Sequence, residues 1–150
     1  MLFSKILIAV DNSPFSLYAS KKGFALAHQL NASVGIVSVI DKSKEAVNTD
    51  LGITPEQSST VLLKQAEEII EQLITLYDGI GEVFRFTPQG FPKTEILNII
   101  NEWEPDLVIM GSHGHSGLQH ILLGSVTEYI MKHTDVPVMV CHKHNKNKTV

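Results

Sequence analysis

Short apolar runs alternate with longer amphipathic stretches along the chain, and this alternation restricts the fold more than any other feature. The apolar runs predict strands at Lys5–Val10, Ser33–Ile40, Glu82–Thr87, Leu107–Met110 and Val136–Cys141. The stretches between them predict helices over 14–30, 55–77, 94–103 and 125–133. Continuous apolar strands that alternate with helices are typical of a parallel sheet covered on both faces. The sequence therefore predicts an α/β fold, a doubly wound five-stranded parallel sheet with helices on both faces.

Helix boundaries are marked by capping residues. Ser13 is expected to cap the first helix, with Pro14 at its first position. Thr54 and Gln57 have the spacing of a capping box at the start of the second helix. The residues expected to face the core are Leu17, Phe24, Ala27 and Leu30 in the first helix, and Leu62, Leu63, Ala66, Ile69, Ile70, Leu73 and Leu76 or Tyr77 in the second.

Composition narrows the class of protein. The chain has 150 residues, with a predicted single domain over 1–150, a core at about 3–142 and a polar tail at 143–150. Its net charge is −4, which disfavours nucleic acid as a partner. No apolar run approaches the roughly 18–20 residues that span a bilayer, so no membrane partner is expected. The single cysteine, Cys141, fits a reducing compartment, and a cytoplasmic location is expected.

Polar groups follow two of the predicted strands. Asp11 comes after the first strand and Gly111 after the fourth. In an open α/β sheet a ligand lies beyond the carboxyl ends of the strands, where the strand order reverses. If these two strands flank the reversal, the sheet order is 3-2-1-4-5 and both loops meet at one crevice.

The loop after the fourth strand is the main candidate for a ligand site. Its glycines follow the pattern Gly111-x2-Gly114-x9-Gly124-Ser125, and it leads directly into a helix. Backbone N–H groups and the helix dipole favour an anion at such a helix start. The alternative is a long connection with ordinary turn glycines. Loop length, the hydroxyls of Ser112, Ser116 and Ser125, and a capping-box pattern from Ser125 to Glu128 favour phosphate binding.

Other phosphate and hydrolase motifs are excluded. The chain has no G-x-x-x-x-G-K-[ST] and no G-x-G-x-x-G after its first strand. The segment 114–117 is one residue short of G-x-S-x-G. No Lys or Arg occurs between Asp106 and Met131, although phosphoryl-transfer enzymes place cations on the transferring group. Binding is therefore favoured over catalysis, and no catalytic residue is assigned.

The histidines and one polar segment allow more than one interpretation. His113, His115 and His120 lie in or near the loop, where metal coordination, solvent exposure and a hydrogen bond from His113 to phosphate are alternatives. Cys141, His142 and His144 could suggest a metal site, but on a polar tail they are expected to be solvated. The polar segment 41–53 is interpreted as a flap or a disordered stretch, with no assigned role.

Taken together and in order, these motifs resemble the ATP-binding branch of the universal stress protein family over about residues 3–142. The glycine pattern G-x2-G-x9-G-[ST] is its most specific mark. The others are V-D-N-S at 10–13, G-F-P at 90–92, D-L-V-I-M-G-S at 106–112 and V-P-V-M-V at 136–140.

The resemblance implies an adenine nucleotide, ATP or else ADP or AMP, held in the crevice with Mg²⁺ as an option. Asp11 would contact the ribose or a nucleotide-bound Mg²⁺, or else only cap the first helix. Ile40 would meet adenine through its backbone, and Met110 would pack on the nucleoside, while both also suit the core. The phosphates would lie on Gly111, Gly114, Gly124, Ser125 and Val126, with His113 beside them.

The resemblance also implies a stress-response protein that binds ATP rather than turning it over. A slow ATPase or nucleotide hydrolase is one alternative, and an interaction module that binds no nucleotide is another. Val136–Cys141 would pair with its copy in a homodimer, which would also cover an exposed apolar edge strand.

Overall fold

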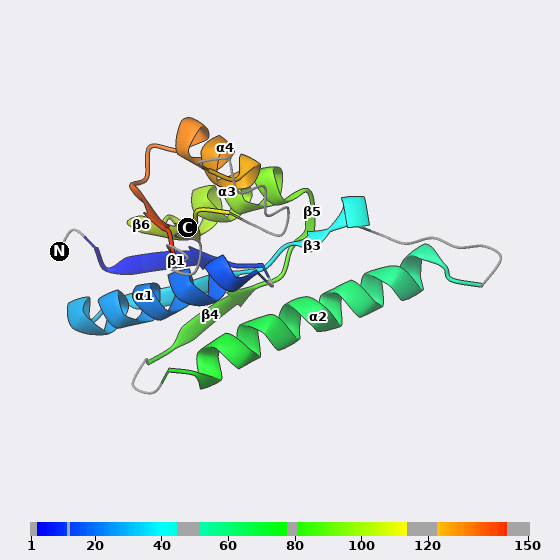
Figure 1. Ribbon diagram of the computed structural model, residues 1–150, viewed down its shortest axis with the longest axis horizontal. Coiled ribbons are helices and arrows are strands. Elements are labelled where there is room, and N and C mark those ends of the chain that lie inside the picture. The colour runs from blue at the N-terminus through cyan, green and yellow to red at the C-terminus, as the bar shows by residue number, and fades with distance from the viewer. Residues whose placement is uncertain (1–2, 12, 45–51, 78–80, 114–122, 144–150) are drawn as a thin grey trace, which may run out of the picture.

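The computed structural model describes residues 3–11, 13–44, 52–77, 81–113 and 123–143. Figure 1 shows the arrangement of its helices and strands. The strands are β1 (Lys5–Ala9), β2 (Ser33–Val37), β3 (Ile40–Asp41), β4 (Val83–Phe86), β5 (Gln89–Gly90), β6 (Leu107–Gly111) and β7 (Val138–Cys141). The helices are α1 (Pro14–Leu30), α2 (Pro55–Thr75), α3 (Pro92–Trp103) and α4 (Ser125–His133), with a 3₁₀ turn, η1, at Lys42–Lys44.

The main sheet is parallel and has the order β4-β2-β1-β6-β7. The register places Ile8 between Ile36 and Ile109, in the middle of the sheet. Counting only the five strands predicted from sequence, this is the order 3-2-1-4-5, so the predicted fold is confirmed. The strand order reverses between β1 and β6.

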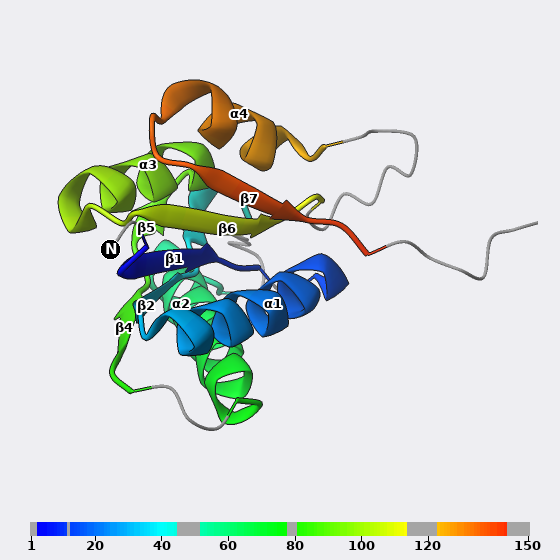
Figure 2. The ribbon, with the colours of Figure 1, turned by 90° about the vertical axis from the view of Figure 1, so that its left-hand side faces the viewer.

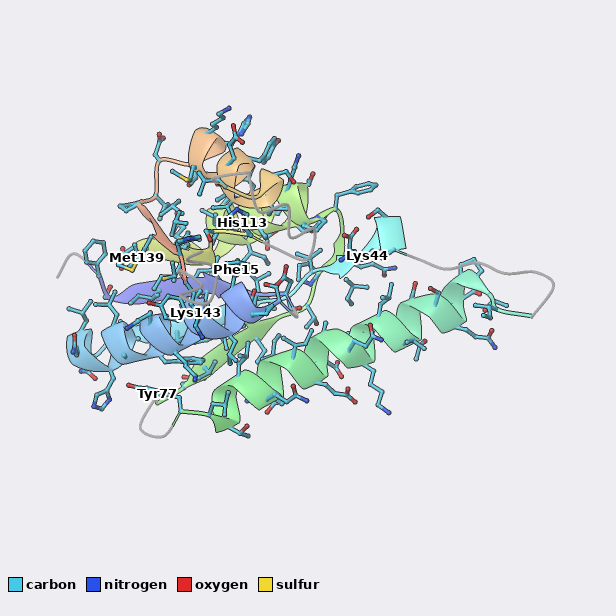
Figure 3. The ribbon with its side chains drawn as sticks, in the orientation of Figure 1. Phe15, Lys44, Tyr77, His113, Met139 and Lys143 are labelled. Atoms are coloured by element: carbon cyan, nitrogen blue, oxygen red, sulfur yellow. The ribbon has the colours of Figure 1, made fainter. Side chains whose placement is uncertain are left out.

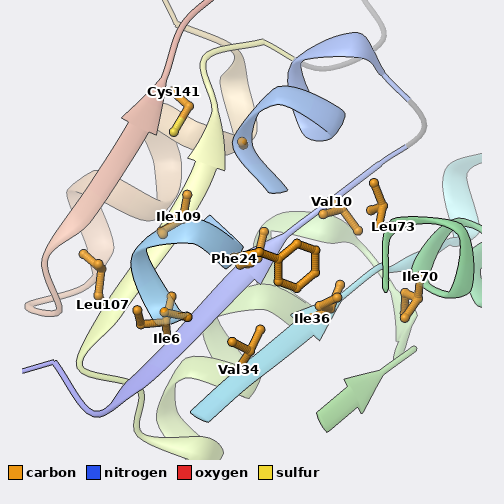
Figure 4. Close-up of a cluster of buried hydrophobic side chains, with 13 residues drawn as sticks. Ile6, Val10, Phe24, Val34, Ile36, Ile70, Leu73, Leu107, Ile109 and Cys141 are labelled. Atoms are coloured by element: carbon orange, nitrogen blue, oxygen red, sulfur yellow. The ribbon is translucent and has the colours of Figure 1, made fainter. Parts of the chain in front are cut away.

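Helices cover both faces of the sheet, α1 and α2 on one and α3 and α4 on the other (Figure 2). Alternate residues of β1 supply the two hydrophobic clusters. Ile6 and Ile8 belong to the cluster with Phe24 of α1 and Ile70 of α2, drawn in Figure 4. Leu7 and Ala9 belong to the other cluster, which also contains Ile96, Ile99, Ile100 and Ile130. Burial on both faces explains why the strand sequences are continuously apolar.

The start of α1 agrees with the prediction, but one of its predicted core residues does not. Ser13 is the N-cap and accepts a hydrogen bond from the Ser16 N–H, with Pro14 following. Leu17, predicted to face the core, is 39% exposed. Apart from Phe24, the buried residues of α1 are small, because the helix lies close to the sheet. A Cβ on Gly23 would lie 2.7 Å from Ile8 Cδ1.

The predicted second strand, Ser33–Ile40, is interrupted. β2 ends at Val37, and Ile40 belongs to β3, which pairs with β5 in a separate two-stranded sheet. The Ser38 N–H donates to the Phe86 carbonyl and the Ile40 N–H to the Pro88 carbonyl. The chain thus continues along the neighbouring segment after it leaves the main sheet, and β3 leads into η1.

Both edges of the main sheet are where the sequence predicted them. β4 lies at one edge and β7 at the other, although β7 begins at Val138 rather than at Val136. The long helix α2 has the predicted capping box from Thr54 to Gln57. Near its end Leu76 is 61% exposed, so of the two predicted alternatives Tyr77 is the residue that packs on the core. No helix in the described part of the chain is long and apolar enough to cross a membrane.

Candidate functional site

A cavity of about 450 Å³ opens at the carboxyl ends of β1 and β6, where the strand order reverses. This is where the rule for open α/β sheets places a ligand. Its described lining residues are Ala9, Val10, Asp11, Ser16, Val39, Asp41, Lys44, Pro92, Ile96, Met110, Gly111, His113, Gly124, Ser125, Val126 and Thr127. Apolar residues from the sheet and α3 thus share the wall with polar residues from the loops, a combination common in small-molecule sites.

Asp11 organises the first turn of α1 at the edge of the cavity. Its Oδ1 accepts hydrogen bonds from the Ser13 N–H at 2.9 Å and from the Ser16 hydroxyl at 2.8 Å. The Asp11 N–H in turn donates to Ser16 Oγ at 2.8 Å. Ser13 rather than Asp11 is the N-cap of α1, and Asp11 instead holds the turn that precedes the helix. Because Asp11 also lines the cavity, a ligand contact remains compatible with it.

Gly111 is the junction between β6, α1 and α4. A Cβ at this position would lie 2.8 Å from Phe15 Cβ and 3.0 Å from the Phe15 backbone. Its carbonyl accepts a hydrogen bond of 2.9 Å from the buried Thr127 hydroxyl. Close packing against α1 thus requires a glycine here, whatever else the cavity holds.

Hydrogen bonds join the two ends of the candidate phosphate loop. The Gly124 N–H donates to the Ser112 carbonyl at 2.6 Å, and the Ser112 N–H donates to the Cys141 carbonyl at 3.0 Å. These bonds tie both ends of the loop to the end of β6 and to β7. Gly114, His115, Ser116 and His120 lie outside the described residues, so the structure gives no position for the second glycine of the motif.

The predicted capping box from Ser125 to Glu128 is wrong. Gly124 is the N-cap, in an extended conformation, and Ser125 is the first helical residue. Glu128 accepts a hydrogen bond from Lys132 at 2.8 Å, which lowers the pKa of the Glu128 carboxyl. The Thr127 hydroxyl, bonded to the Gly111 carbonyl, anchors the first turn to β6 in this register.

The start of α4 therefore opens into the cavity without a side-chain cap from the described residues. Gly124, Ser125 and Val126 all line the cavity. The first N–H groups of a helix have no intrahelical partner and carry the positive end of the helix dipole. This end of the cavity is built to attract an anion.

His113 and His142 both lie within hydrogen-bond distance of the buried Ser112 hydroxyl. Ser112, 1% exposed, has its Oγ 3.0 Å from His113 Nδ1 and 2.8 Å from His142 Nδ1. A hydroxyl carries one proton, so at most one of these nitrogens accepts from it. The Phe15 ring packs beside both imidazoles, and Figure 3 labels Phe15 and His113. Among the described residues no group of three or more metal-ligating side chains forms.

Ile40 and Met110 differ in their relation to the cavity. Met110 is 4% exposed and lines it. Ile40 is absent from the described lining, and its N–H is bonded to the Pro88 carbonyl. Its neighbours Val39 and Asp41 are part of the wall instead, because successive side chains of extended backbone point to opposite sides.

Lys44 is one of the lining residues that the sequence analysis did not predict, and it is the one that brings a positively charged side chain. The argument from the cation-free segment 106–131 holds along the chain, but the structure brings Lys44 of η1 to the same cavity. Figure 3 labels Lys44 on η1 and His113 after β6. The only available signal was the polar segment that begins at 41, for which no role was predicted.

Fold and cavity define a doubly wound α/β protein with a ligand crevice at its switch point. The chain belongs to the universal stress protein family, whose profile matches residues 2–142. Universal stress protein MJ0531 of Methanocaldococcus jannaschii is 31% identical over 150 residues, covering 97% of this chain and 85% of that one. Universal stress protein MJ0577 of the same organism is 30% identical over 159 residues, covering 97% and 98%.

Solved structures share the fold. The structure of MJ0577 superposes with a TM-score of 0.84 at 29% identity, covering 97% of this chain and all of that one. A universal stress protein in complex with cAMP has a TM-score of 0.62 at 20% identity, covering 93% and 97%. One from Archaeoglobus fulgidus in complex with dAMP has a TM-score of 0.56 at 18% identity, covering 93% and 98%. The last two likenesses concern the fold alone.

Proposed function

We propose that this protein binds ATP, or another adenine nucleotide, in the cavity at the carboxyl ends of β1 and β6, and that it acts in a stress response through its bound state. The observation that carries the proposal is the start of α4, which has no side-chain cap among the described residues and places Gly124, Ser125 and Val126 in the cavity wall. An anionic ligand is what such a helix start favours. The complexes of related folds with cAMP and dAMP support an adenine nucleotide.

The wall residues fit the parts of a nucleotide. Phosphate lies on the N–H groups of Ser125 and Val126, with Gly111, Gly114, Gly124 and His113 beside it. Met110 packs on the nucleoside, and the backbone near Ile40 meets adenine, with Val39 as the wall residue there. A volume of about 450 Å³ is within the range of small-molecule pockets.

Asp11 contacts the ribose or a Mg²⁺ ion on the phosphates. The chemistry of its carboxylate suits magnesium, which takes one or two protein carboxylates together with phosphate oxygens and water. Since Oδ1 already holds the start of α1, Oδ2 is the atom proposed for this contact.

The first experiment removes one N–H group without removing the helix. Ser125→Pro suits the first helical position, and the extended Gly124 before it accepts a following proline. Losing one hydrogen bond to a charged phosphate is expected to weaken ATP binding about tenfold or more in calorimetry.

The matched control is Ser125→Ala, which removes the hydroxyl and keeps the N–H. It is expected to bind ATP within about threefold of the wild type, if backbone groups hold the phosphate. Wild-type protein that binds no ATP at millimolar concentration would contradict the proposal. If Ser125→Ala weakens ATP binding as much as Ser125→Pro does, the Ser125 hydroxyl rather than its N–H binds the phosphate.

Slow ATP hydrolysis is the second candidate, and Lys44 is the observation that favours it. A cation in the cavity wall supplies the charge that the loop sequence lacks. Multiple turnovers of ATP by purified wild-type protein, lost in Lys44→Met, would establish this function. Binding without turnover would leave the first proposal as the function.

We also propose that residues 3–142 act as one domain and that β7 pairs with its copy in a homodimer. Both hydrophobic clusters share the main sheet, which makes a single unit. β7 is an edge strand, and its Met139 side chain is 39% exposed. Light scattering is expected to give a dimer mass at micromolar concentration for the wild type and a monomer for Met139→Lys. A wild-type monomer at that concentration would rule the dimer out.

A further inference from the structure

Lys44 reaches the cavity because the chain leaves the main sheet after β2. β3 pairs with β5, with Ile40 opposite Gln89 and Asp41 opposite Gly90. This ribbon carries the backbone to the cavity, and η1 follows immediately at Lys42–Lys44. If β2 continued along the main sheet, the backbone would not reach the cavity at this point. The small sheet therefore determines where Lys44 lies.

Asp41 fixes the turn that presents Lys44. Its Oδ1 accepts hydrogen bonds from the Ser43 N–H at 3.0 Å and the Ser43 hydroxyl at 2.6 Å. A side chain that bonds the backbone two residues on holds a turn without any other support. Lys44 comes next in the chain and lines the cavity, whereas Lys42, which is exposed like Lys44, is not in the described lining.

The charges on the described wall are unevenly distributed. Among the described lining residues, Asp11 and Asp41 are acidic, and Lys44 is the one that is either lysine or arginine. The N–H groups at the start of α4 offer partial positive charge over the first turn only. A single phosphate can be held there. A chain of phosphates extends beyond that reach, and its further charge needs a cation.

We propose that Lys44 binds the phosphates beyond the one at the start of α4, so that the site prefers nucleoside di- and triphosphates to monophosphates and cyclic monophosphates. This inference rests on the proposed function and names the class of nucleotide. A lysine ammonium is a compact point charge on a flexible stem, which suits phosphates of varying position. Lys44 is a specificity-determining residue in this scheme.

The test compares Lys44→Met with Lys42→Met in the full chain. Both changes remove one positive charge from η1, but only Lys44 lines the cavity. Calorimetry with ATP, ADP, AMP and cAMP, each with Mg²⁺, is expected to show tighter binding of ATP and ADP by the wild type. Lys44→Met should weaken ATP about tenfold or more and change AMP by less than about twofold, as for the loss of one charge-assisted bond.

Lys42→Met should bind all four ligands like the wild type, and Lys44→Arg should restore most of the preference for ATP. Both variants lie on an exposed turn, so circular dichroism should show unchanged folding.

Several results would overturn the inference. The inference is wrong if Lys44→Met binds ATP as tightly as the wild type, or if Lys42→Met loses as much affinity as Lys44→Met. It is also wrong if Lys44→Met weakens ATP and AMP equally. None of these results would contradict nucleotide binding itself. Wild-type protein that binds none of the four ligands would overturn the proposed function together with the inference.

Discussion

The polar groups at the two ends of the parallel sheet differ in what they contact. At the amino end, Asp106 Oδ2 accepts hydrogen bonds of 2.9 Å from the Ser4 N–H, the Ser4 hydroxyl and the Lys5 N–H. Lys5 Nζ donates to the Trp103 carbonyl and lies 4.6 Å from the centroid of its ring. At this end, the Asp106 carboxylate and the Lys5 ammonium therefore interact with neighbouring protein groups.

At the carboxyl end, polar groups line an open volume. The start of α4 has no side-chain cap from the described residues, and Asp11, Asp41 and Lys44 share one cavity wall. The contrast shows which end is structural and which is suited to a ligand. Both ends carry charge, and among the described residues the charged groups and helix N–H groups at the carboxyl end line a cavity of about 450 Å³.

The largest expected effect comes from Gly111→Val, at the junction of the carboxyl end. The Cβ of the new side chain would lie 3.0 Å from the Phe15 backbone, and backbone cannot move aside cheaply. We expect a loss of roughly 2–3 kcal/mol in the free energy of unfolding, measured by urea denaturation.

The matched control is Gly81→Val, before β4 at the amino end. A Cβ there meets nothing within 4 Å among the described surroundings, so its effect should stay within about 0.5 kcal/mol. Equal destabilisation by the two variants would contradict the close packing assigned to Gly111.

A smaller effect is expected from Thr127→Val, which keeps the shape and removes the hydroxyl that bonds the Gly111 carbonyl. The buried carbonyl loses its partner, at a cost of about 1–2 kcal/mol in unfolding free energy. Thr60→Val is the control, because the Thr60 hydroxyl makes the same kind of bond, to the Glu56 carbonyl, on an exposed helix face. The control should change stability little, and a reversed order would refute the anchoring of α4 through Thr127.

The smallest effect concerns the pH dependence of the amino end. The Ser4 N–H, followed by the Ser4 hydroxyl and the Lys5 N–H, holds the pKa of Asp106 below its ordinary value. A lowered folded-state pKa stabilises the protein above the unfolded-state pKa, near 3.9, and the stabilisation is lost as pH falls through the lowered value. Asp106→Asn should thus be less stable than the wild type at neutral pH, with a gap that narrows below about pH 4.

Thermal melts across this pH range provide the measurement. Ser4→Ala removes one of the three bonds to Asp106 and should retain part of the pH dependence. A gap between Asp106→Asn and the wild type that stays constant down to about pH 2 would show that these bonds do not act through the charge.

Local sequence signals predicted the fold well, because both faces of the sheet are buried and each strand is therefore apolar throughout. Ser13 and Pro14 marked the start of α1, and the strand order followed from the polar residues Asp11 and Gly111. Ser125 was wrongly predicted to cap α4, since its spacing to Glu128 suits a capping box. A long-range bond from Thr127 to the Gly111 carbonyl anchors the helix, with Gly124 as its N-cap.

The predicted parts of the site are those that follow directly from the strand order, including Asp11 after β1 and Met110 in β6. The glycine loop and Met110 lie on one continuous segment, and their shared cavity followed from the strand order. Lys44 was missed because its position depends on the pairing of β3 with β5, which no local pattern reveals. The same pairing removed Ile40 from the described wall and replaced it with its two neighbours.

The hydrogen bond between the Gly124 N–H and the Ser112 carbonyl has a consequence for protein engineering. It joins the two ends of segment 113–123, so a change in the length of that segment is not expected to move the end of β6 or the start of α4. Doubling the length of such a segment adds only about 0.6 kcal/mol of closure entropy. Insertions between these two anchors are therefore expected to leave the register of the sheet unchanged.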